Sequence, residues 1–137
     1  MRGSEPRDDR LSAQQVLAQI RRARQAFQRT GYVMGSLKLA AEFRALDLIT
    51  GDEQREGIEG VLDEISSEDY RGPHPPRHIA GEPISKGARM LGFVWSSARF
   101  RQRMYFKFCL SGKAGRERLV VLSLHEEYRP DYFEKLG

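Results

Sequence analysis

The sequence predicts an α+β domain in which helices pack on one face of a small antiparallel sheet. Two observations support this: the first half of the chain holds amphipathic helical patterns that begin at capping motifs, and the second half holds strand-like runs joined by glycine-containing turns. A chain of 137 residues is long enough for one domain with a real core. We therefore expect residues 1–11 to form a disordered leader and residues 12–137 to form a single domain.

The first helix is predicted from its cap and its apolar stripe. Ser12 and Gln15 have the spacing of a capping box, and apolar residues follow on one helical face. Gly31 is expected to end this helix. Residues 32–34 (YVM) then suit a short strand. This order predicts a helix followed at once by a strand.

Two more helices are expected before residue 66. The second should open at residues 35–36 and continue through Leu37, Ala40, Phe43 and Leu46. The third should begin at a capping box formed by Thr50 and Glu53, because apolar residues follow it at the i, i+3, i+4, i+7 spacing of a helix. Most of the acidic residues of this region are then explained by the start of that helix, where its dipole favours negative charge.

Residues 66–87 predict a long irregular loop, because they hold four prolines and three glycines. Residues 89–95 (RMLGFVW) follow as a predicted strand. At the other end of the chain, residues 126–137 form a tail broken by Pro130, whose aromatic side chains we expect to pack on the domain or on a partner.

The most informative stretch is residues 99–125, which predicts a hairpin. From 99 to 110 the odd positions carry four cations and Tyr105, whereas the even positions are mostly apolar, which is the alternation of a strand. Residues 111–118 form a basic turn, and residues 119–125 (LVVLSLH) return. We expect Ser123 and His125 to share the face of Tyr105. On the other face, three residues should point inward against Phe106 and Phe108: Val120, Leu122 and Leu124.

Charge is distributed unevenly along the chain. Residues 1–41 carry a net +5, residues 42–69 carry −8 and residues 71–125 carry +9. Of the 23 cationic side chains 18 are arginines, whose planar fork suits phosphate. This distribution favours a nucleic-acid partner for the predicted sheet, and the alternative is a merely solvated, arginine-rich surface.

Other features narrow the class of protein. No apolar run approaches the ~18 residues of a membrane span, and residues 1–10 lack the apolar core of a signal peptide. The single cysteine excludes an internal disulfide, so we expect a reducing cytoplasm. His74 and His78 match no zinc spacing with Cys109 or His125, so no metal or other cofactor is predicted.

The remaining polar residues have the chemistry needed to cleave RNA without a metal. The 2′-hydroxyl of RNA attacks the adjacent phosphorus, so the protein needs cations, an acceptor for the 2′ proton and a donor for the leaving 5′ oxygen. Histidine titrates near neutrality and can donate, whereas arginine acts only by its charge. The alternative is that Tyr105 and His125 are ordinary cross-strand neighbours.

Three short segments resemble the MqsR-type toxins of bacterial toxin–antitoxin pairs, which are mRNA interferases related in fold to RelE. Residues 65–71 (ISSEDYR) resemble the family's Leu-Ser-x-x-Asp-Phe-Tyr-Lys step, and residues 104–108 (MYFKF) resemble its Val-Tyr-Leu-Lys-Ile strand. Residues 122–127 (LSLHEE) resemble its terminal Val-Ser-Phe-Lys-Glu-Lys strand. The resemblance covers about residues 36–127, and it implies a RelE/MqsR-like fold and a cognate antitoxin protein.

The resemblance also implies which residues are catalytic. The family's lysine after the tyrosine falls on Arg71, its strand tyrosine on Tyr105 and its terminal lysine on His125. A family glutamine falls near Gly92, so that amide is missing here.

The sequence therefore predicts a metal-independent endoribonuclease toxin acting on single-stranded RNA. Arg71 would clamp phosphate, Tyr105 would orient or deprotonate the 2′-hydroxyl, and His125 would be the general acid. The alternatives are a non-catalytic RNA-binding protein and a pure protein-interaction module. In either RNA hypothesis the backbone would be held by a further set of cations: Arg99, Arg101, Arg103, Lys107 and Lys113.

Overall fold

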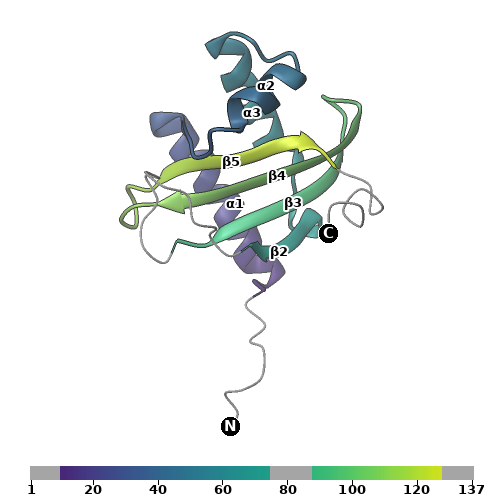
Figure 1. The fold of residues 1–137 in the computed structure, drawn as a ribbon. Coiled ribbons are helices and arrows are strands. Elements are labelled where there is room, and N and C mark those ends of the chain that lie inside the picture. The colour runs from purple at the N-terminus through teal and green to yellow at the C-terminus, as the bar shows by residue number, and fades with distance from the viewer. Residues whose placement is uncertain (1–9, 75–87, 128–137) are drawn as a thin grey trace.

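The computed structural model describes residues 10–74 and 88–127. Its helices are α1 (Ala13–Thr30), α2 (Leu39–Ala45) and α3 (Gly51–Glu64), followed by a 3₁₀ turn, η1 (Ser67–Asp69). Its strands are β1 (Tyr32–Met34), β2 (Tyr70–His74), β3 (Met90–Ser97), β4 (Gln102–Ser111) and β5 (Arg118–Glu126) (Figure 1). None of the described helices has the combination of length and apolar character that a membrane crossing requires.

The five strands form one sheet in the order β1-β5-β4-β3-β2. β2, β3, β4 and β5 pair antiparallel, whereas β1 runs parallel to β5. The predicted α+β class is confirmed, but the sheet is mixed rather than purely antiparallel. α1 leads directly into β1. Because β1 pairs with β5, the first and the last described strands are neighbours in the sheet.

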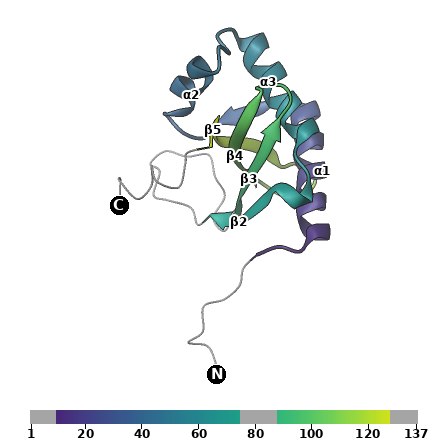
Figure 2. The same ribbon diagram turned by 90° about the vertical axis from the view of Figure 1, so that its right-hand side faces the viewer.

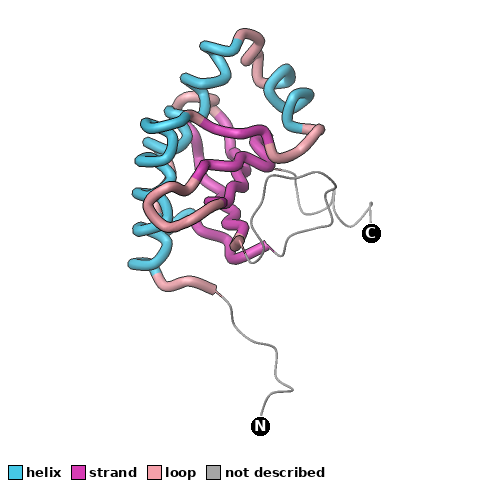
Figure 3. The backbone as a smooth tube through the Cα atoms, turned by 90° about the vertical axis from the view of Figure 1, so that its left-hand side faces the viewer, coloured by secondary structure: helices cyan, strands magenta, loops and turns pink. Residues whose placement is uncertain are grey.

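The helices cover one face of the sheet, as Figures 2 and 3 show from opposite sides. We call this the helix-covered face and the other the opposite face. α1 and α3 bury their apolar stripes against the sheet, and Leu39 and Phe43 of α2 join the same core. α2 makes its contacts with β5, at one end of the layer. The strands contribute alternate residues to this core: Leu91, Phe93, Trp95, Met104, Phe106, Phe108, Leu119, Val121 and Leu124.

Both predicted capping boxes are confirmed. The Ser12 hydroxyl accepts the Gln15 N–H at 3.2 Å while the Gln15 side chain accepts the Ser12 N–H at 2.8 Å. Thr50 and Glu53 make the same reciprocal pair at 3.0 and 2.9 Å. Gly31 ends α1 with φ 77°, a conformation that glycine adopts without a steric penalty. Local chemistry therefore determines where these helices begin and end.

The second helix is shorter than the sequence indicated. It begins at Leu39, so the predicted start at residues 35–36 was wrong, and Leu37 lies before the helix with its side chain 99% exposed. The chain before it runs alongside β5: the Gly35 N–H donates to the Val121 carbonyl at 2.8 Å. A side chain at Gly35 would meet the Val120 methyl at 2.5 Å, so only glycine permits this approach.

The prediction of an irregular loop over residues 66–87 is wrong for residues 67–74. Residues 67–69 form η1 and residues 70–74 form the edge strand β2. Pairing with β3 shifts between Tyr70 and Pro73, where Gly72 has φ 109°. An edge strand tolerates proline because one of its sides has no ladder to complete. Residues 75–87 lie outside the described residues, as does the aromatic tail from residue 128.

The predicted β4 starts three residues too early. Residues 98–101 form the turn after β3, in which the Arg101 N–H donates to the Ser97 carbonyl at 2.9 Å and Arg101 has φ 59°. The alternating pattern on β4 therefore holds only from residue 102. Arg103, Tyr105 and Lys107 do lie on the face opposite the core, as expected.

A β-bulge corrects the predicted packing of β5. Phe106 pairs with Leu124, but Phe108 pairs with Val121, so β5 has one extra residue between these pairs. A bulge resets the alternation of the strand that contains it. Leu124 consequently faces the helices as expected, whereas Val120 and Leu122 do not. They form a second buried cluster with Met90 and Cys109.

A carboxylate joins the end of α3 to the hairpin. Glu64 accepts hydrogen bonds from the Trp95 indole (2.8 Å), the Ser97 hydroxyl (2.7 Å) and the Arg99 N–H (2.9 Å). Burial raises the pKa of the Glu64 carboxyl, but these hydrogen bonds outweigh it and hold the pKa below its usual value. The ionised form therefore favours the folded state.

We expect Glu64→Gln to lower the free energy of unfolding at neutral pH by about 1–2 kcal/mol, because charge-assisted hydrogen bonds are lost. Since the folded pKa is depressed, this stabilisation is present above pH 4.5 and disappears as the pH falls through the folded pKa. Urea unfolding followed by fluorescence of Trp95, the single tryptophan, measures it. Asp63→Asn is the control, because Asp63 is 71% exposed. An equal loss in both variants would contradict the role of Glu64.

Candidate functional site

The site is built around two aromatic side chains on adjacent strands. Tyr105 of β4 pairs directly with His125 of β5, and their ring centroids are 5.1 Å apart with 36° between the planes. Both residues are partly buried. Both lie on the opposite face, because Phe106 and Leu124 next to them point into the core. The predicted shared face of Tyr105 and His125 is therefore confirmed, because the bulge lies beyond Lys107 and leaves this pairing undisturbed.

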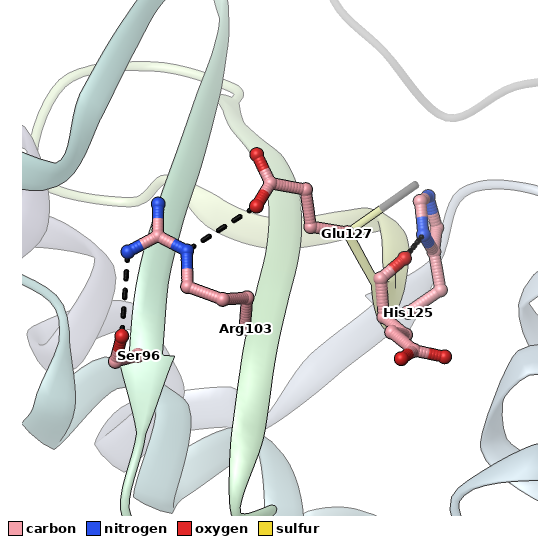
Figure 4. Close-up of polar contacts among 5 residues, drawn as sticks. Ser96, Arg103, His125 and Glu127 are labelled. Carbon is pink, nitrogen blue, oxygen red and sulfur yellow. Dashed lines mark hydrogen bonds and ion pairs between the residues drawn. The ribbon is translucent and has the colours of Figure 1, made fainter. Parts of the chain in front are cut away.

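The imidazole of His125 has a defined orientation. Its Nδ1 lies 2.7 Å from the Glu126 carbonyl oxygen (Figure 4). A carbonyl only accepts hydrogen bonds, so Nδ1 is the nitrogen that carries the proton in this contact. Nε2 is then an acceptor in the neutral ring and carries a proton only in the imidazolium. The imidazolium form suits a general acid, which must present a transferable proton from a fixed ring.

Tyr105 is held in its protonated form. Burial raises its pKa to about 12, and the negative charge of Glu42 acts in the same direction. At neutral pH the hydroxyl can therefore donate a hydrogen bond but has almost no phenolate with which to accept a proton. Of the two roles expected for Tyr105, the structure favours orientation of a substrate over deprotonation of it.

Glu42 is the site residue that sequence reasoning missed. It projects from α2, and its Oε1 accepts the Leu124 N–H at 2.9 Å, one residue before His125. β1 pairs with β5 only as far as Val121, so Glu42 occupies the edge of β5 beyond that strand. An isolated acid on a predicted helix carries no signal for this position, because the contact depends on how α2 packs against β5.

Arg103 lies on the same face of β4, two residues before Tyr105. Its Nε donates to the Glu127 carboxylate at 3.2 Å and its Nη1 donates to the Ser96 hydroxyl at 3.3 Å (Figure 4). The guanidinium and its carboxylate partner are respectively 50% and 38% exposed. Such an exposed ion pair is worth about 0–1 kcal/mol, so an incoming phosphate could displace Glu127.

Lys107 extends the row on the other side of Tyr105. It pairs with Ser123, which is buried, while Lys107 itself is partly exposed. Alternate residues of a strand are about 6.6 Å apart, so Arg103, Tyr105 and Lys107 form an evenly spaced line of polar groups. His125 and Glu42 flank this line on the β5 side.

The other predicted phosphate ligands lie away from this row. Arg71 is on β2, two strands or about 10 Å from β4, and its guanidinium donates to the carbonyls of Glu68 and Tyr70. Arg99 lies against Gly60 of α3, on the side of the helices. Arg101 is in the β3–β4 turn and Lys113 in the β4–β5 turn, and both are exposed. Arg99 and Arg101 are therefore not on the strand face where the sequence pattern placed them.

The described residues contain no group of three histidine, cysteine or acidic side chains placed to hold a metal ion. Cys109 is buried in the second cluster. His78 lies outside the described residues, and only the backbone pairing of His74 with Met90 is defined. The candidate site therefore consists of the Tyr105 phenol, the His125 imidazole and the Glu42 carboxylate, together with the cations of Arg103 and Lys107.

Comparison with known proteins finds no matching family model, no matching curated protein and no matching solved structure. The geometry of the site and the short segments that resemble MqsR-type toxins are therefore the grounds for a functional conclusion.

Proposed function

We propose that this protein is a metal-independent endoribonuclease that cleaves single-stranded RNA by attack of the substrate's own 2′-hydroxyl. The observation that carries the proposal is the direct cross-strand pairing of Tyr105 and His125 in a row with Arg103 and Lys107. These residues supply a hydrogen-bond donor, a proton donor and two cations on one face. A substrate with a phosphodiester and an adjacent hydroxyl matches that set.

Each group has a distinct role in the proposed reaction. The 2′ oxygen forms a bond to phosphorus as the bond from phosphorus to the 5′ oxygen breaks. His125 gives its Nε2 proton to the departing 5′ oxygen, and the cations stabilise the charge that builds on the phosphoryl oxygens. Tyr105 donates a hydrogen bond that orients the substrate. The products are a 2′,3′-cyclic phosphate and a 5′-hydroxyl.

The position of Arg71 fits a supporting role in this proposal. It follows Tyr70, which belongs to the core, and its own side chain is exposed. Its backbone is separated from β4 by β3, so it would hold a neighbouring phosphate rather than the scissile one. Lys113 and Arg101 lie in turns away from the row, so they would contact only nucleotides further along the RNA.

The toxin assignment and its cognate antitoxin rest on the resemblance to MqsR-type proteins, whereas the cytoplasmic location rests on the single cysteine of the sequence. The antitoxin would be a protein that covers Tyr105 and His125, since blocking that surface would stop cleavage.

We expect cleavage of a labelled single-stranded RNA to persist in excess chelator and to leave cyclic-phosphate and 5′-hydroxyl ends, because every proposed group is a side chain. End-group analysis of the products measures this. Cleavage that vanishes with chelator and returns with a divalent ion would contradict the proposal. Salt-dependent RNA binding with no cleavage would instead support the non-catalytic RNA-binding alternative, with a log–log slope of about −0.7 per phosphate contact.

A further inference from the structure

The proposed reaction lacks one component, an acceptor for the 2′ proton. Tyr105 stays protonated at neutral pH, and arginine and lysine are cations under these conditions. His125 must begin the reaction with a proton on Nε2 if it is to donate one. The acceptor must therefore be another group within reach of the same substrate.

Glu42 has the position that this acceptor requires. Its Oε1 is fixed by the Leu124 N–H at 2.9 Å, and Leu124 lies between Ser123 and His125 on β5. The backbone amide that holds Glu42 thus belongs to the strand that carries the imidazole. α2 packs on β5 (Figure 2), and the hydrogen bond from the Leu124 N–H to Glu42 lies beyond the last pair between β1 and β5.

The two oxygens of Glu42 have different surroundings. Oε1 accepts the hydrogen bond from the Leu124 N–H, whereas no described residue donates a hydrogen bond to Oε2. The side chain is partly exposed rather than sealed in the core. A carboxylate anchored through one oxygen keeps the other in a fixed place with its lone pairs available, which is the requirement for a general base.

We propose that Glu42 is the general base of this site and accepts the 2′-hydroxyl proton of RNA on Oε2 while His125 donates to the 5′ oxygen. This inference rests on the proposed endoribonuclease function. The carboxylate gains one proton and the imidazolium loses one, so a later exchange through water restores both groups. Tyr105 on β4 and His125 on β5 are the titratable groups that share its surroundings, and the charge of Glu42 is felt at Tyr105.

Glu42→Gln tests the assignment with little change in structure, because the amide oxygen can still accept the Leu124 N–H. We expect the cleavage rate for a labelled single-stranded RNA to fall about 10²–10⁴-fold with RNA affinity kept. Glu42→Asp should restore part of the rate. Glu56→Gln, an exposed acid on α3 with the same charge change, should behave as wild type.

A second measurement does not depend on cleavage. Ultraviolet titration of tyrosinate should show a lower pKa for Tyr105 in Glu42→Gln, with Tyr105→Phe used to identify its signal among the five tyrosines. An unchanged titration would overturn the placement of Glu42 beside Tyr105. If wild type cleaves and Glu42→Gln cleaves equally well, the base assignment fails and the proposed function stands. If wild type cleaves no RNA, the function and the base role fail together.

Discussion

Replacing His125 with alanine should lower RNA cleavage about 10²–10⁴-fold while leaving the fold and the affinity for RNA nearly unchanged. A proton donor acts on the leaving oxygen in the transition state, so its removal affects kcat more than substrate binding. The ring is partly exposed, and it contacts the Tyr105 ring and the Glu126 carbonyl rather than the core. Loss of these contacts leaves the core intact.

Single-turnover cleavage measured beside RNA binding separates the two effects, and the thermal midpoint reports the fold. Glu126→Ala is the matched control, because it changes the adjacent exposed side chain and keeps the carbonyl that orients His125. If His125→Ala unfolds the protein but keeps full activity per folded molecule, the histidine is structural. The assignment of a general acid would then be wrong.

Phe108→Ala should lower the free energy of unfolding by about 3–5 kcal/mol. Phe108 is fully buried. Its ring is nearly parallel to that of Phe93, with 5.7 Å between the ring centroids, and its centroid lies 5.6 Å from that of Phe106. Truncation removes these contacts and leaves a cavity where helices and sheet meet. A domain of this kind is stable by about 5–15 kcal/mol in total, so the loss is a large share.

Urea unfolding measures this loss, with the slope checked for two-state behaviour. Phe108→Leu is the control, since a smaller change in shape should cost clearly less than the alanine substitution. A loss below about 1 kcal/mol for Phe108→Ala would mean that the aromatic layer is not the centre of the core, in contrast to its full burial.

The parts of the fold that could be predicted are those encoded by neighbouring residues. Ser12 with Gln15, and Thr50 with Glu53, set the helix starts because each pair satisfies its own backbone groups. The alternation along β4 likewise places Tyr105 and Lys107 on one face. In these cases the interaction partner lies within a few residues in the sequence.

The parts that could not be predicted depend on contacts between distant segments. Residues 119–122 are apolar without a break because β5 is buried on both faces there, so their pattern does not reveal the bulge. Arg99 and Arg101 continue the alternation of β4 but belong to a turn that has no glycine or proline. β2 was hidden by Gly72 and Pro73, which read as loop residues but occur on an edge strand.

The same limit applies to the candidate site. The strand pattern brings Tyr105 and His125 together, since both positions follow from the hairpin. Glu42 reaches them only because α2 docks on the free edge of β5. A lone carboxylate on a helix usually faces solvent, so the residue type alone does not indicate this contact. Sequence periodicity holds no information on such an approach.

The parallel pairing of β1 with β5 has a consequence for how the protein is made. Tyr32 pairs with Leu119, so β1 cannot find its partner until the ribosome has synthesised β5, more than 80 residues later. Long-range pairings of this kind slow folding, because a large loop must close before any contact forms. His125 and the amide that anchors Glu42 are both in β5. A nascent or truncated chain ending before β5 would therefore lack the assembled site, so the proposed activity can begin only after β5 has been synthesised and has joined the sheet.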